Sequence, residues 1–153
     1  MKVMQQRSPM SNKENVRTFF VYADEFFFAA QELEKSHNPN KVATASYYLY
    51  GHALELAYKA FLYKNGSTIK ELKDIVGHDL EKALKMARDN GIGEYLSIDA
   101  AYESAVKSLN KYYSTKELEY MSATTKTFPL LMDVKDVVKK TINSLFAVLT
   151  EHL

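Results

Sequence analysis

The chain has 153 residues, with 20 Lys and Arg against 19 Asp and Glu, which corresponds to one domain of nearly neutral charge. This balance argues against a large nucleic-acid footprint. The absence of Cys excludes disulfides, thiolate catalysis and Cys-type zinc sites, and fits a reducing compartment. The start of the chain lacks the apolar stretch of a signal peptide, and no apolar run is long enough to span a membrane. We therefore expect a cytoplasmic protein without a membrane contact.

The N-terminal residues 1–12 are polar and aperiodic, so we expect a flexible tail followed by a single domain over residues 13–153. A helix is predicted from about Asn15 to Lys35, because apolar residues recur there three and four positions apart. Its inward side chains are expected to be Val16, Phe19, Phe20, Ala23, Phe26, Phe27, Ala30 and Leu33, with Tyr22 and Phe28 widening the stripe.

A second helix, from about Val42 to Lys64, is apolar or aromatic on almost every side. Gly51 lies in its interior and costs about 1 kcal/mol relative to Ala, which predicts close approach by another helix or side chain. The ionisable side chains between its ends, apart from tyrosine phenols, form a single stripe along the helix together with one of those tyrosines. The members of this stripe are Tyr48, His52, Glu55 and Lys59.

The rest of the chain predicts further helices over about 67–76, 79–90, 98–112 and 131–149, with an irregular segment over 113–127. Residues expected to face inward are Leu80, Leu84, Ala87, Ala101, Ala105, Val106, Leu109, Val134, Val137, Val138, Ile142, Leu145, Phe146 and Leu149. No stretch alternates over the length of a strand. The sequence therefore predicts an all-α fold, an antiparallel up-and-down bundle of about five main helices.

The stripe is the first candidate site, because charges on a buried helix are costly unless partners meet them. His78 and Asp79 begin a later helix, and His78 reaches Glu55 if that helix docks on the stripe. A structural network that fixes helix register is the favoured interpretation, since buried charges are usually paired, and a ligand site is the alternative. His52-x-x-Glu55 occurs only once and H-E-x-x-H is absent, so we expect neither a metal nor a cofactor.

A second candidate site lies at the end of the helix predicted over 98–112. Tyrosines beside lysines can stack on bases or hold phosphates, but they also occur at ordinary helix ends. The residues are Asn110, Tyr112, Tyr113 and Lys116, followed by Glu119 and Tyr120. Nucleophilic catalysis has little support, since G-x-S-x-G and a Gly-rich phosphate loop are absent. His37 and His152 are expected to be exposed bystanders.

Three segments carry a family resemblance. ASYYLYGHALELAYKAFLYKNG, GHDLEKALKMARDNG and LNKYYSTKELEY together resemble the HEPN domain superfamily, in particular its small, stand-alone bacterial members, over about residues 16–149. The resemblance implies an antiparallel helical bundle and a homodimer. It further implies ribonuclease activity in a toxin or defence system, nucleotide binding, or pairing with a nucleotidyltransferase or an antitoxin-type partner.

The catalytic motif of that superfamily, an Arg and a His separated by four residues, is absent. Arg7, Arg17 and Arg88 are each followed at that spacing by a residue other than His. We therefore expect a HEPN-like protein that binds a small ligand, a nucleotide, RNA or a partner protein without catalysis. The alternative is a divergent ribonuclease or nucleotide-acting enzyme that uses His52, Glu55 and His78.

Overall fold

The computed structural model describes residues 12–38, 41–119 and 126–150, and every regular element in these ranges is helical. The elements are α1 (Asn12–Glu34), α2 (Ala43–Lys64), α3 (Ile69–Glu71), the π-helix η2 (Leu72–Val76), α4 (Leu80–Asp89), the 3-10 helix η3 (Ile92–Glu94), α5 (Ala100–Tyr113) and α6 (Leu131–Thr150). The predicted all-α class is confirmed. The expected N-terminal tail lies outside the described residues, except for its last residue, where α1 begins.

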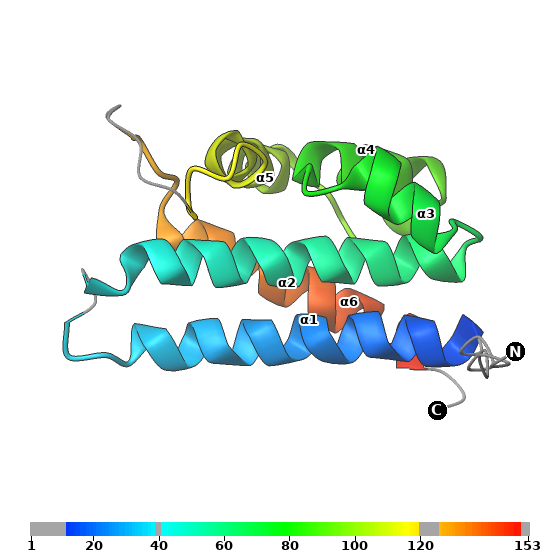
Figure 1. Ribbon diagram of the computed structural model, residues 1–153, viewed down its shortest axis with the longest axis horizontal. Coiled ribbons are helices and arrows are strands. Elements are labelled where there is room, and N and C mark those ends of the chain that lie inside the picture. Colours follow the sequence, from blue (N-terminus) through cyan, green and yellow to red (C-terminus); the bar gives the residue numbers. More distant parts are fainter. Residues whose placement is uncertain (1–11, 39–40, 120–125, 151–153) are drawn as a thin grey trace, which may run out of the picture.

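Helix α2 is the centre of the fold. Its residues from Tyr50 to Leu62 are all buried except His52, which explains why this helix is apolar on almost every side. Helix α1 lies along one side of α2, α4 and α5 lie on the other, and α6 lies behind (Figure 1). Figure 1 views α5 nearly along its axis while α2 lies in the plane of the picture, so α5 crosses α2.

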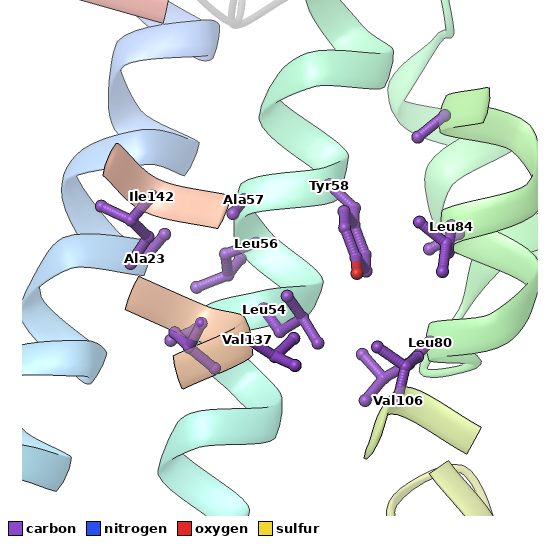
Figure 2. Packing of buried hydrophobic residues seen from close by; sticks show 14 of the residues in the cluster. Ala23, Leu54, Leu56, Ala57, Tyr58, Leu80, Leu84, Val106, Val137 and Ile142 are labelled. Atoms are coloured by element: carbon purple, nitrogen blue, oxygen red, sulfur yellow. The ribbon is translucent and has the colours of Figure 1, made fainter. Parts of the chain in front are cut away.

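The core consists of apolar side chains that leave α2 in opposite directions. Ala57 points toward Ala23 of α1 and Ile142 of α6, whereas Tyr58 points toward Leu84 of α4 (Figure 2). A fully buried aliphatic or aromatic side chain contributes about 1.5–3 kcal/mol relative to an exposed one, so these two contact layers hold the helices together.

Helices α1 and α6 run antiparallel to each other. Glu34 near the end of α1 forms an ion pair with Lys135 near the start of α6, at 3.0 Å between Oε2 and Nζ. At the opposite end, the rings of Phe20 and Phe146 lie 6.0 Å apart. Helices α1 and α2 are also antiparallel, because Phe19 contacts Tyr63 and the short connection joins the other ends.

Four side chains that the sequence pattern placed inward or on the widened stripe lie outside the core. Tyr22, Phe28, Ala101 and Phe146 are exposed. Tyr22 and Phe28 sit on the outer edge of α1, and the core-facing stripe is filled by its predicted inward members, fully or in part. Periodicity alone made the apolar stripe too wide, since an exposed apolar residue is common on a protein surface.

The segment between α2 and α4 turns through the π-helix η2 and a glycine. Gly77 has a φ of 53°, a conformation that side-chain-bearing residues rarely adopt, and His78 follows it directly. Asp79 then caps α4 by accepting a hydrogen bond from the backbone N–H of Lys82 at 3.0 Å. The predicted break between a helix ending near residue 76 and one beginning near residue 79 is confirmed, although a π-helix was not foreseen.

A buried hydroxyl chain, formed by Tyr58, Tyr102 and Thr141, connects α2, α5 and α6. Thr141 donates to the backbone carbonyl of Val137 at 2.7 Å, so its oxygen accepts from Tyr102, also at 2.7 Å. The oxygen of Tyr102 must then accept from Tyr58. Burial raises the pKa of Tyr102 to about 12 and that of Tyr58 well above its usual value, so the chain stays neutral.

Candidate functional site

The Glu55 cluster, made of His52, Glu55, Lys59, His78 and Tyr113, joins three parts of the chain around one carboxylate. The Glu55 side chain is only 3% exposed. Its Oε1 lies 2.7 Å from His78 Nδ1 and accepts from the Tyr113 hydroxyl at 3.0 Å. Its Oε2 accepts from Lys59 Nζ at 3.2 Å. The contact between His78 and Glu55 is the one expected if α4 docks against the stripe on α2.

The hydrogen bonds fix which nitrogen of His78 carries the proton. An ionised carboxylate can only accept, so Nδ1 of His78 is the donor to Glu55. In the neutral ring the lone pair then lies on Nε2. Since the His78 side chain is 52% exposed while its carboxylate partner at Nδ1 is buried, we expect Nε2 to face the accessible side of the ring.

His52 has the same proton arrangement but a more enclosed position. Its Nδ1 lies 3.2 Å from the Tyr113 hydroxyl, whose proton is given to Glu55, so Nδ1 donates. The ring of His52 packs edge-on against Phe26, with 4.5 Å between ring centroids, and lies parallel to the Tyr48 ring, with 5.9 Å between centroids. Burial lowers the pKa of His52, and the neighbouring Glu55 carboxylate opposes this shift.

Gly51 allows Tyr113 to reach the cluster. A Cβ atom at Gly51 would lie 2.5 Å from Cδ2 of the Tyr113 ring, which is well inside van der Waals contact. The close approach predicted from this glycine is therefore confirmed, and the approaching group is a side chain of α5. Burial raises the pKa of Tyr113, and Glu55 raises it further, so the phenol remains a hydrogen-bond donor.

The structure divides the second candidate site, which the sequence treated as one group. Asn110 turns toward α4, where its Oδ1 accepts from the Leu80 backbone at 2.8 Å and its Nδ2 donates to Asp79 at 3.0 Å. Tyr113 joins Glu55 instead. Successive positions on a helix point in different directions, so residues that are neighbours in sequence serve different partners.

The remaining members of that group also separate. Tyr112 is buried, packs on Phe128 and accepts from the backbone N–H of Thr127 at 2.7 Å. Lys116 is exposed and has a φ of 61°. The pKa of Tyr48 is raised first by burial and then by the Glu119 carboxylate. Asn110 with Asp79 is thus a capping pair for α4, and Tyr120 lies outside the described residues.

Exposure rises along the Glu55 cluster from its centre to its edge. The side chains are 3% exposed at Glu55, 11% at Lys59, 23% at His52 and 52% at His78. Both hydrogen-bonding positions of Glu55 Oε1 are occupied, so the carboxylate orients and neutralises its neighbours. The imidazoles are the groups that can contact a ligand.

Metal binding has no geometric support in this part of the chain. Among the described residues, no group of three or more His, Asp or Glu is arranged to hold a metal ion. Within the same residues, no helix combines the length and apolar character needed to cross a bilayer. His37 is exposed as expected, whereas His152 lies outside the described residues.

Fold and site together define an all-α protein with a charged His–Glu–His–Lys cluster centred on a buried helix. No family model, no curated protein and no solved structure matches the chain. The residues of the cluster and their geometry therefore carry the functional argument.

Proposed function

We propose that this chain is a non-catalytic, HEPN-like binding protein in which the Glu55 cluster aligns three helices and presents His52 and His78 to a nucleotide or to RNA. The observation that carries the proposal is the enclosure of Glu55, which is 3% exposed with its Oε1 and Oε2 both accepting hydrogen bonds. A general base must reach its substrate, and this carboxylate does not.

The edge of the cluster has the chemistry to hold a base and a phosphate. The half-buried rings of Tyr48 and His52 are stacked with an interplanar angle of 6°, and aromatic faces of this kind bind nucleobases. The exposed His78 can contact phosphate oxygens, since an imidazole can carry positive charge. A site for one or a few nucleotides is consistent with the nearly neutral overall charge.

The proposal includes the HEPN-like antiparallel up-and-down bundle, a homodimer, and a cytoplasmic role beside an antitoxin-type partner or a nucleotidyltransferase. The antiparallel packing of α1 with α2 and with α6 supports the bundle, although α5 crosses α2. The absence of Cys supports a reducing compartment.

The test combines binding and cleavage in one sample. Fluorescence anisotropy with a labelled RNA oligonucleotide and with a labelled nucleotide measures binding, and gel electrophoresis of the same RNA measures cleavage. We expect binding without cleavage, and we expect it to weaken in Tyr48→Ala and His78→Gln but not in His37→Gln, the control at an exposed His. Failure to bind either probe would contradict the proposed ligand class.

The alternative function is a divergent ribonuclease or nucleotide-acting enzyme. The observation in its favour is the Glu55–His78 pair, because a carboxylate that holds Nδ1–H of an imidazole leaves Nε2 free for proton transfer. Under this alternative Glu55 orients His78, and His52 is the second acid–base group. RNA degradation that disappears in His78→Gln or His52→Gln would establish the enzyme and overturn the binding proposal.

A further inference from the structure

The three described histidines differ in the two properties that make an imidazole nucleophilic. His78 has both a carboxylate on Nδ1 and an exposed ring. His52 has the same proton arrangement, but its side chain is 23% exposed and packed between aromatic rings. His37 is exposed, and among the described residues no carboxylate forms an ion pair or a hydrogen bond with it. Comparing the three histidines therefore separates the effect of a carboxylate partner on Nδ1 from the effect of ring exposure.

The geometry points to His78 as a phosphoryl-acceptor site, modified at Nε2 by a small donor of the phosphoramidate or acyl-phosphate class. A carboxylate that accepts from Nδ1–H fixes the tautomer and the orientation of the ring, as it does for histidines that bind metals, and leaves the lone pair on Nε2. Histidine is also an established covalent nucleophile. The carboxylate of Glu55 is held in place by Lys59 and Tyr113, so the orientation of His78 is fixed before a donor arrives.

The transfer step balances without a further reactant. With phosphoramidate, the Nε2 lone pair of neutral His78 forms a bond to phosphorus as the phosphorus–nitrogen bond of the donor breaks and ammonia leaves. The ring of the product is an imidazolium whose Nδ1–H remains hydrogen-bonded to Glu55, so the buried carboxylate compensates the new ring charge. The phosphoryl group itself extends from the exposed side of the ring, where water solvates its negative charge.

Modification would regulate the proposed binding site, because it converts a group that can carry positive charge into a negative one. The phosphorylation itself does not rest on the proposed function, since it is measured without any nucleotide or RNA. Loss of ligand binding and loss of phosphorylation are therefore separate results.

The test exposes the full-length protein to phosphoramidate and maps phosphohistidine by mass spectrometry over time. We expect His78 to be labelled several-fold faster than His37 or His52, because only His78 combines a carboxylate on Nδ1 with an exposed ring. Glu55→Gln should reduce the His78 rate toward that of His37, while Glu32→Gln, at an exposed carboxylate on α1, should leave it unchanged. Equal rates at His78 and His37 in the unmodified protein would overturn the proposal.

A second measurement needs no substitution, which protects the test if Glu55→Gln does not fold. Nitrogen-15 NMR of the imidazoles should show His78 with its proton on Nδ1 in the neutral form. A proton on Nε2 instead would remove the lone pair from the exposed nitrogen and would also overturn the proposal.

Discussion

The hydroxyl chain and the Glu55 cluster both connect α2 to α5, but they do so with different chemistry. The hydroxyl chain is neutral, sealed, and ends on the backbone carbonyl of Val137. The Glu55 cluster is charged and continues to the surface through His52 and His78. Neutral hydroxyls satisfy each other at little cost, whereas buried charges require several kcal/mol of compensation per ion.

This difference indicates what the charged cluster adds. If alignment of α2 with α5 were the only requirement, a neutral chain such as that of Tyr58, Tyr102 and Thr141 would meet it. The Glu55 cluster adds charge at its buried centre, and its His78 end opens to solvent, where a ligand can reach it. That contrast favours a binding role for the cluster in addition to its structural one.

The largest effect is expected from Glu55→Ala, which leaves Lys59, His78 and Tyr113 without their shared acceptor. The free energy of unfolding should fall by about 3–5 kcal/mol, the typical cost of breaking a buried ion pair from one side. Urea denaturation followed by circular dichroism measures it. The matched control is Glu32→Ala, which removes an exposed pair with Lys35 and should cost less than about 1 kcal/mol. Equal losses of unfolding free energy in Glu55→Ala and Glu32→Ala would contradict a buried, mutually dependent Glu55 cluster.

The direction of the hydroxyl chain predicts an order for two matched variants. Tyr102→Phe removes the acceptor of the fully buried Tyr58 hydroxyl and should cost about 1–3 kcal/mol. Tyr58→Phe removes only a donor, while Tyr102 still donates to Thr141, so about 1 kcal/mol is expected. Thermal unfolding of the two proteins side by side gives the order. A larger loss in Tyr58→Phe would mean that the chain runs the other way.

Gly51→Ala tests the contact that brings Tyr113 into the Glu55 cluster. The new methyl group would overlap the Tyr113 ring, and overpacking costs about 1–3 kcal/mol, against which Ala gains about 1 kcal/mol in helix propensity. We expect a net loss of about 1 kcal/mol in unfolding free energy. Gly93→Ala is the control, since no atom lies within 4 Å of its Cβ position. Stabilisation by Gly51→Ala would contradict the close packing of the Tyr113 ring on Gly51.

The smallest expected effect is a pH dependence of the unfolding free energy, which the Glu55 cluster should show through His52 and the neutral hydroxyl chain should not. Burial holds the pKa of His52 below its ordinary 6.5, so the unfolded state binds the proton more tightly than the folded state does. The contribution of His52 to stability is therefore complete above pH 6.5 and is lost as the pH falls below it. The unfolding free energy of His52→Gln should decline less between pH 7 and pH 5 than that of the unmodified protein. Parallel curves would contradict this assignment.

The sequence was most informative where all the residues that carry a pattern lie on one helix. The stripe on α2 and the unfavourable glycine inside the helix were both recognisable in the sequence. The structure explains them by the contact of His78 with Glu55 and by the packing of the Tyr113 ring on Gly51. The sequence did not show which residues of the other helices contact the stripe and Gly51. The phenol that fills the space at Gly51 comes from Tyr113, which the pattern had grouped with Asn110 and Lys116 in a separate site.

The hydroxyl chain was missed for a related reason. Tyr58, Tyr102 and Thr141 come from three helices, and no spacing within one helix indicates that they meet. The one available signal was compositional, since 11 Tyr and no Trp suggest a core with phenol tips that need partners. Contacts between helices depend on their crossing and register, which a single sequence does not specify.

The measurement that tests the account most directly is a double-mutant cycle between Glu55→Gln and His78→Gln, with unfolding free energies from urea denaturation. The cost of leaving Lys59 without its carboxylate occurs in both branches of the cycle and cancels. If Glu55 holds the start of α4 against α2 through His78, the two changes should couple by about 1–3 kcal/mol. Additivity within about 0.5 kcal/mol, the range found for independent sites, would contradict the central role of this contact.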